Sequence, residues 1–286
     1  MFERIAARLR PASSAREDLE YEIGGVRIRL PAGHRLPEYQ SSHPWYDRFL
    51  PHFVSHLPPG TTVIDVGANC GDTLAAMAST RPDASYVCIE PDETFTSYLR
   101  ENVARLQRAH AGLQVRSIPA LVGKDVAGAS LLGAGGTKHA VAGNAIKSVT
   151  LDSLVDAQTQ VSLLKSDVDG FDYDVLRSAE QLLRAQHPIL FFECFCETPE
   201  QEDGYASCFE WLSSLGYARW VVFDNFGQVI SARATAEQVR DWADYVWRQA
   251  RMPSTRTIYY LDLLCCCEAD EAMIHAALAS YGPFAH

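Results

Sequence analysis

The stretch V-I-D-V-G-A-N-C-G-D, residues Val63 to Asp72, decides the fold. Its apolar start predicts a buried strand, and its glycines predict a turn that opens a helix. Glycine lets the backbone approach a ligand closely, and the first N–H groups of a helix are free to bind one. The stretch therefore predicts a ligand site where a strand meets a helix.

Downstream of Thr61, apolar runs alternate with amphipathic stretches, which is the pattern of βαβ units around a largely parallel sheet. We expect further strands at 86–91, 113–123, 161–168, 188–195, 217–224 and 256–267. We expect helices at 72–80, 92–109, 171–186 and 235–249, with Asp92 as an N-cap. The Gly-rich stretch 133–145 has neither period and predicts a long loop.

Residues 1–57 read as an N-terminal extension and a candidate cap over the substrate. It comprises a short helix over 1–17, a hairpin over 19–31 turning at Gly24-Gly25, and an edge helix whose apolar positions run from Tyr46 to Leu57. Residues 58–286 then form the ligand-binding domain.

The composition is that of an ordinary globular protein, with 286 residues of which 47% are hydrophobic. A formal net charge of -11 argues against a nucleic-acid partner, which usually needs concentrated Lys and Arg. There is no export signal and no apolar run near the roughly 20 residues of a membrane span, which predicts a cytoplasmic protein without an integral membrane segment. The eight cysteines lie mostly in apolar stretches, so we expect buried free thiols and no metal site among them.

The glycine spacing indicates which ligand binds. Gly67 and Gly71 make G-x-x-x-G, which departs from the G-x-G-x-x-G of dinucleotide sites. S-adenosylmethionine has no phosphate, and Asp65 at a strand end suits its positive charges. Glu90, about twenty residues further on, can accept hydrogen bonds from ribose hydroxyls, and Asp92 can add a contact. A nicotinamide-dependent oxidoreductase and a non-catalytic nucleoside-cofactor binding module remain the alternatives.

A second acidic cluster follows a central strand in L-L-K-S-D-V-D-G-F-D, which contains Lys165, Asp167 and Asp169. Ligands bind beyond the carboxyl ends of parallel strands, so Asp167 should face the same crevice as Gly67 and Glu90. A carboxylate there can act as a general base, orient a nucleophile or help hold a divalent cation, and Lys165 can keep it ionised. For Asp169, helix capping within an ion pair is the competing interpretation.

Five motifs, in order, resemble the FkbM family of methyltransferases: V-I-D-V-G-A-N-C-G-D, C-I-E-P-D, S-V-T-L-D-S-L, L-L-K-S-D-V-D-G-F-D-Y-D-V-L-R-S-A and I-L-F-F-E. The resemblance spans roughly residues 60–195 and weakens toward both ends. It implies a class I methyltransferase fold, Rossmann-like, with a mixed seven-stranded sheet flanked by helices. It also implies S-adenosylmethionine as methyl donor and hydroxyls of sugars or natural products as acceptors. Ser166 and Asp169 stand where the family often has Ile and Glu.

The function predicted is O-methylation of a small-molecule or glycan acceptor, such as a surface-polysaccharide or glycolipid precursor. By position in the motifs, the resemblance implies cofactor contacts at Asp65, Gly67, Ala68, Asn69, Gly71, Glu90, Pro91, Asp92 and Asp167. The catalytic candidates are Asp167, Lys165 and His139.

Several other side chains remain open between structure and function. Glu193 ends a buried strand, so it either faces the crevice or is paired. Aromatic rings stack on sugar faces, so four N-terminal residues are candidates for the pocket wall: His34, Tyr39, His43 and Trp45. For Trp45, packing is the favoured role.

Overall fold

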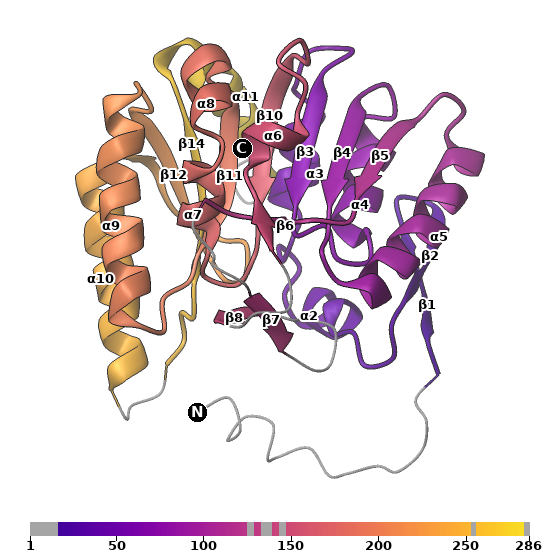
Figure 1. Ribbon diagram of the computed structural model, residues 1–286, viewed down its shortest axis with the longest axis horizontal. Coiled ribbons are helices and arrows are strands. Elements are labelled where there is room, and N and C mark those ends of the chain that lie inside the picture. The colour runs from indigo at the N-terminus through magenta and orange to yellow at the C-terminus, as the bar shows by residue number, and fades with distance from the viewer. Residues whose placement is uncertain (1–16, 125–128, 133–138, 143–146, 253–255, 283–286) are drawn as a thin grey trace.

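The computed structural model describes residues 17–124, 129–132, 139–142, 147–252 and 256–282. An eight-stranded sheet forms its centre, in the order β13-β12-β14-β11-β10-β3-β4-β5 (Figure 1). The strands are β3 (Thr62–Val66), β4 (Ser85–Ile89), β5 (Gln114–Ile118), β10 (Val161–Ser166), β11 (Ile189–Cys194), β12 (Arg219–Asp224), β13 (Val229–Ala234) and β14 (Leu261–Cys266). Neighbours from β5 to β11 pair in parallel, whereas β14 runs antiparallel to both β11 and β12.

The mixed sheet flanked by helices is confirmed, but it has one strand more than the seven predicted. The additional strand is β13, which forms a hairpin with β12 at the sheet edge. Its side chains are mostly half-buried or exposed, so it lacks the apolar run by which the central strands were recognised. Gly227, at φ 77°, makes the turn that brings β13 back onto β12.

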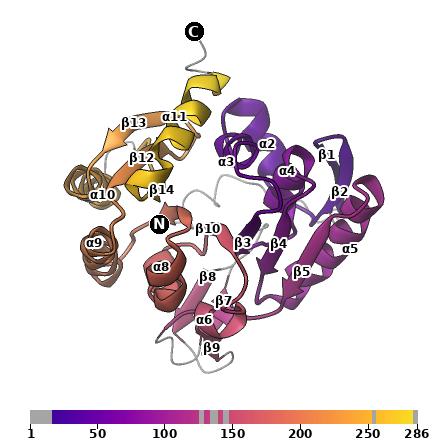
Figure 2. The same ribbon diagram turned by 90° about the horizontal axis from the view of Figure 1, so that it is seen from above.

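Helices cover both faces of the sheet (Figure 2). One face carries α3 (Phe49–Val54), α4 (Asp72–Thr80), α5 (Glu93–Ala109) and α11 (Glu271–Ser280), preceded by the short 3-10 helix η1 (Glu268–Asp270). The other carries α6 (Leu151–Leu154), α7 (Asp172–Arg177), α8 (Glu180–Gln186), α9 (Pro199–Ser214) and α10 (Ala236–Arg251). The side chains between each helical layer and the sheet form two cores.

Two predicted elements are interrupted, each for a local reason. The strand expected over 113–123 divides into β5 and β6 (Leu121–Val122), which pairs with β9 (Ser148–Val149), because Pro119 cannot donate to a ladder. The helix expected over 171–186 divides into α7 and α8 near Ser178, whose carbonyl accepts from Asp152 N while the Asp152 carboxylate accepts from the first amides of α8.

The Gly-rich stretch also differs from the prediction of a loop without strands. β8 (His139–Ala142) lies inside it and pairs with β7 (Ala129–Leu132). The helix expected over 1–17 lies outside the described residues, except for its last one. The helix expected from Tyr46 onward begins only at Phe49, and a separate helix, α2 (Leu36–Ser42), precedes it.

The hairpin of β1 (Leu19–Ile23) and β2 (Val26–Leu30) turns at Gly24-Gly25 as predicted. Asn102 of α5 is fully buried against it. Its Nδ2 donates to Arg29 O and Cys70 O, each at 2.8 Å, and its Oδ1 accepts from Arg29 N at 2.8 Å. One amide side chain therefore joins the extension, α5 and the turn after β3.

The remaining fold-level expectations concern cysteines and membranes. All eight cysteines are free, and seven of them are buried. In the described part of the chain, no helix combines the length and apolarity that crossing a membrane requires.

Replacing Asn102 by Ala should lower the free energy of unfolding by roughly 2–3 kcal/mol, because it leaves a backbone amide and two carbonyls without their partner. The expected fall in melting temperature is roughly 4–10 °C, measured by calorimetry. Arg100→Ala, an exposed change on the same helix, is the control and should shift it little. Equal shifts in the two variants would contradict the joining role of Asn102.

Candidate active site

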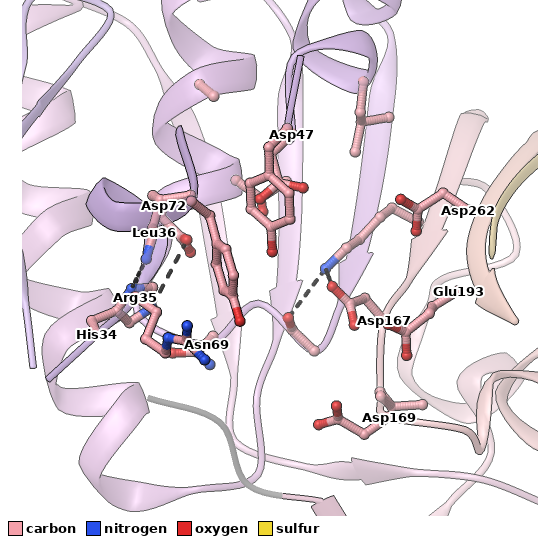
Figure 3. A pocket seen from close by; sticks show the side chains of 18 of the residues that line it. His34, Arg35, Leu36, Asp47, Asn69, Asp72, Asp167, Asp169, Glu193 and Asp262 are labelled. Carbon is pink, nitrogen blue, oxygen red and sulfur yellow. Dashed lines mark hydrogen bonds and ion pairs between the residues drawn. The ribbon is translucent and has the colours of Figure 1, made fainter. Parts of the chain in front are cut away.

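A cavity of about 1100 Å³ opens at the carboxyl ends of the parallel strands, where Gly67, Glu90, Asp167 and Glu193 all line it (Figure 3). Segments of the N-terminal extension, including α2 and the residues up to Pro51, form another part of its wall. Small-molecule sites usually enclose about 300–1,000 Å³. The cavity is therefore large enough for a cofactor and an acceptor together.

The amides of the turn between β3 and α4 are already paired within the protein. Gly67 N and Ala68 N donate to Ile89 O, at 2.9 and 3.1 Å, and Gly71 N donates to Ala68 O at 2.8 Å. Asn69 N donates to Glu90 Oε2, and Cys70 N donates to Asn69 Oδ1. No side chain of the described residues caps the first turn of α4, which begins at Asp72, so the donors that a ligand could use here belong to the helix rather than to the turn.

Gly67 brings the two acidic motifs into contact. It has φ 76°, and a Cβ added there would overlap the carbonyl oxygen of Asp167. Only glycine fits, because the backbones that follow β3 and β10 touch at this point. The pairing of β10 with β3 continues to this point, since Asp167 N donates to Val66 O at 3.1 Å.

Glu90 is held by the backbone and presented to the cavity. Its Oε2 accepts from Asn69 N at 3.0 Å and its Oε1 accepts from Asp92 N at 2.9 Å. Burial raises the pKa of Glu90 to about 7, although these two amides oppose the shift. Each carboxylate oxygen keeps a lone pair that can accept a hydroxyl hydrogen bond.

Lys165 is paired at the centre of the sheet. Its Nζ lies 2.8 Å from Asp65 Oδ1, 3.2 Å from Gly67 O and 3.9 Å from Asp167 Oδ2. Burial alone would lower the pKa of Lys165, but the carboxylates of Asp65 and Asp167 raise it above its usual value. Lys165 is thus a fixed cation, and Asp65, at zero exposure, is its counter-ion.

Asp167 is the accessible carboxylate of this group, with 55% of its side chain exposed within the open cavity. Asp169 also lines the cavity, and its backbone has φ 53°. Figure 3 shows both beside Glu193 and Asp262, across the cavity from Asn69, Asp72 and His34. The arrangement gives the cavity two distinct walls.

Ser166 lines the cavity, and its hydroxyl positions the turn that carries Asp167. Its Oγ donates to Asp172 Oδ1 at 2.6 Å, and Val168 N donates to the same oxygen at 3.3 Å. Tyr205 Oη lies 3.2 Å from Asp172 Oδ2 and 3.0 Å from Glu193 O. The Ser that replaces the family's usual Ile therefore has a partner, Asp172, that the sequence analysis did not assign.

Three acidic or aromatic positions of the cavity escaped the sequence analysis: Asp47, Asp262 and Tyr260. Asp47 is exposed within the cavity, and the surrounding protein together with nearby carboxylates raises its pKa to about 7. Its φ of 55° is rare for a residue other than glycine. The sequence offered one signal for Asp47, because it is a charged residue within an aromatic segment. No motif marks Tyr260 or Asp262.

The aromatic candidates divide between wall and support. His34, Tyr39 and Trp45 line the cavity, whereas His43 does not and instead stacks on Phe226, with ring centroids 4.1 Å apart. Trp45 also packs against Tyr281, with centroids 5.3 Å apart. These contacts attach the N-terminal segment to the far half of the sheet.

Among the described residues, one cluster has three possible metal ligands within 4.8 Å of one another: His34, Cys70 and Asp72. Leu36 N donates to His34 Nδ1 at 3.3 Å, so the proton of a neutral imidazole sits on Nε2. Nε2 then faces Cys70 Sγ at 3.6 Å and Asp72 Oδ2 at 4.0 Å as a donor. This cluster is a hydrogen-bonded group, and it does not present His34 as a ligand.

Several sequence candidates lie behind the cavity wall. Gly67, Asn69, Glu90, Pro91, Lys165 and Asp167 line it. Asp65, Ala68, Gly71 and Asp92 do not. Asp65 is occupied by Lys165, and Asp92 caps α5 by accepting from Thr94 N and Phe95 N. Only the backbone of His139, in β8, is described, and its side chain lies outside the described part.

The strand order, the antiparallel β14 and the crevice at the carboxyl ends define a class I, Rossmann-like methyltransferase fold, extended here by β13. The model of the methyltransferase FkbM domain matches residues 65–219, more than half of the chain. The chain therefore belongs to the FkbM family of S-adenosylmethionine-dependent methyltransferases. Among curated proteins, no sequence matches it.

Solved structures that resemble the chain are distant. An FkbM methyltransferase from Methylobacillus flagellatus has 14% identity and a TM-score of 0.41; the match covers 72% of this chain and 43% of that one, so the chain spans less than half of its length. The plantazolicin methyltransferase BpumL, in complex with SAH, has 12% identity and a TM-score of 0.42, covering 81% and 89%. An O-methyltransferase from Thermotoga maritima has 13% identity and a TM-score of 0.41, and the match covers 77% of this chain and 64% of that one.

Asp172 should make stability fall as the pH rises. Burial raises its pKa from 3.8 to about 7, so the folded state holds a proton that the unfolded state has lost between these values. The contribution of Asp172 to the free energy of unfolding is greatest below pH 3.8 and is lost as the pH rises through about 7. Asp172→Asn, which keeps the acceptor for Ser166, should flatten the slope by up to about 1.4 kcal/mol per pH unit in urea titrations.

The control is Asp203→Asn, which changes an exposed carboxyl on α9 and should leave the slope unchanged. An unaltered slope in Asp172→Asn would show that Asp172 titrates normally in the folded protein.

Proposed function

We propose that the protein transfers a methyl group from S-adenosylmethionine to a hydroxyl group of a sugar or a natural product. The observation that carries this is the joining of two motifs at one point, where Gly67 contacts the backbone of Asp167. A cofactor-binding turn and an accessible carboxylate then share one cavity. The donor, when bound, supplies an electrophilic methyl group on a sulfonium.

The wall formed by Gly67, Asn69, Glu90 and Pro91 would hold the cofactor. Glu90, fixed by two amides, would accept hydrogen bonds from the ribose hydroxyls. This requires the ionised carboxylate, and binding would therefore favour the charged form of a group whose pKa is near 7 when the site is free of ligand. Asp65 would act at a distance, by fixing Lys165.

Asp167 would orient the acceptor hydroxyl and take its proton as the methyl group is transferred. Its side chain is accessible, and Lys165 Nζ lies 3.9 Å from its Oδ2. Lys165 cannot itself act as a base, because its raised pKa keeps it protonated. Positioning the hydroxyl against the methyl would supply much of the rate enhancement.

The N-terminal extension would act as the cap that closes the acceptor side. Its residues Tyr39, Trp45, Tyr46 and Asp47 line the cavity. Excluding water there would protect the methyl donor from side reactions and strengthen the electrostatic interactions between the cavity's charged groups and the ligands. The nicotinamide-dependent alternative is weakened because Gly67 and Gly71 lack the G-x-G-x-x-G spacing and the amides from Gly67 to Cys70 are paired within the protein.

Calorimetric titration tests the cofactor assignment. We expect S-adenosylhomocysteine to bind in the micromolar range and NADH not to bind, because Glu90 fits ribose hydroxyls while the turn lacks the glycine spacing of a dinucleotide site. Glu90→Gln should weaken the former by about tenfold or more, since an amide cannot accept at both positions. Tight binding of NADH alone would favour the oxidoreductase.

Asp167→Asn tests the catalytic assignment once an acceptor is available. Turnover should fall by about 100-fold to 10,000-fold, the range for loss of a general base. The affinity for S-adenosylhomocysteine should change little, because the Glu90 wall is untouched. Asp203→Asn, the exposed control on α9, should keep full turnover; wild-type turnover in Asp167→Asn would remove Asp167 from the mechanism.

A further inference from the structure

The cavity wall formed by β11 and β14 carries two carboxyl groups side by side. Glu193 and Asp262 are direct partners in the antiparallel pairing of these strands, so their side chains project from the same face of the sheet. Both line the cavity, and Figure 3 shows them next to Asp167. Two carboxylates at directly opposed positions repel each other, so both groups can be ionised at low cost only when a cation lies beside them.

No cation in the described part of the chain neutralises this pair. Lys165 is already engaged by Asp65 at 2.8 Å, and its next carboxylate is Asp167. Glu193 is only 8% exposed, and its Oε2 has no hydrogen-bond partner among the described atoms. Burial and the neighbouring carboxylates hold the pKa of Glu193 well above its usual range, as they do for Asp262. An unpartnered carboxyl oxygen in a buried residue that lines a cavity is unusual in a folded protein, and a ligand of the cavity is one source of the missing partner.

Aromatic rings accompany the carboxyl pair. Tyr46, Phe191, Phe223 and Tyr260 line the same cavity. An aromatic face attracts cations, and apolar walls strengthen the interaction of a carboxylate with a cation. Carboxylates and aromatic rings together form the usual surroundings of an organic ammonium group.

We propose that this wall binds an ammonium group of the acceptor, so that the substrate is a hydroxyl compound which also carries a protonated amine, such as an amino sugar or an amino alcohol. The proposal rests on the methyltransferase function above: the amine is held at Glu193 and Asp262 while a hydroxyl lies at Asp167. The same wall repels carboxylate- and phosphate-bearing acceptors, including nucleotide-linked sugars.

Two other cations fit the geometry less well. A metal ion would need at least three converging ligands, and the described residues hold one such group, His34, Cys70 and Asp72, which includes neither Glu193 nor Asp262. The ammonium of the cofactor would be held, with the rest of that molecule, at the wall of Gly67, Asn69 and Glu90, and Figure 3 shows Asn69 across the cavity from Glu193 and Asp262.

The test compares three ring compounds of one shape on protein saturated with S-adenosylhomocysteine: 4-aminocyclohexanol, 1,4-cyclohexanediol and 4-hydroxycyclohexanecarboxylate. Binding is measured by ligand-observed NMR titration. We expect the amino alcohol to bind at least about tenfold more tightly than the diol, and the carboxylate most weakly. In Glu193→Gln/Asp262→Asn the preference should fall to below about twofold, because the charge is lost and the shape is kept.

The matched control is Asp203→Asn/Glu237→Gln, which makes the same change in net charge at exposed positions on α9 and α10 and should keep the preference. The wall variant should melt at no lower a temperature than the wild type, since two largely buried carboxyl groups are replaced by neutral amides of the same shape, and this verifies that it folds.

Four results overturn the proposal: no binding of the amino alcohol, equal binding of the diol, a preference that survives in the wall variant, or tight Mg²⁺ or Ca²⁺ binding that the wall variant abolishes. A loss of S-adenosylhomocysteine affinity in the wall variant would assign the pair to the cofactor and also overturn it. Failure of the methyltransferase assignment is separate, because it appears as absent S-adenosylhomocysteine binding in the wild type. The three compounds are then titrated on the protein alone.

Discussion

The buried ion pair between Lys165 and Asp65 fixes the relative position of everything around the cavity. The two residues are partners in the parallel pairing of β10 with β3, at 2.8 Å and almost without exposure. The ammonium also reaches the carbonyl of Gly67 and the carboxylate of Asp167. One cation therefore orients both turns at once. Removing either partner would leave an uncompensated charge within the sheet, which is far more costly than replacing the pair.

This use of Lys165 determines the electrostatics of the remaining cavity. Because its charge is balanced by Asp65, the other carboxyl groups have no comparable partner, and burial raises the pKa of Glu90 to about 7. A methyl donor with a sulfonium is favoured in such surroundings, and so is a cationic acceptor. An anionic acceptor would meet like charges on several sides.

Sequence reasoning recovered the parts of the site whose geometry is set within a few residues. The turn after β3, the cap at Asp92 and the cluster of Lys165 with Asp167 each follow from one strand end, so local pattern is sufficient. It missed what depends on tertiary packing: the amides of the turn are consumed by Ile89 O and Glu90, and β13 is added at an edge that has little apolar pattern. The break between α7 and α8 arises from Asp152, a residue distant in sequence.

The same distinction separates the chemistry from its specificity. The motif residues on β3, β4 and β10 lie where methyl transfer would occur, and they are brought together by hydrogen bonds within neighbouring strands. Asp47 and Asp262 come from segments without motifs. The stacking of His43 on Phe226 and the edge-to-face contact of Trp45 with Tyr281 hold the segment of Asp47 beside the cavity, whereas Asp262 is placed by the pairing of β14 with β11. The contact of Trp45 with Tyr281 joins the N-terminal extension to the C-terminal end of the chain. A change in either segment would therefore alter the side of the cavity proposed for the acceptor, while the side formed by Gly67, Asn69 and Glu90 keeps its geometry.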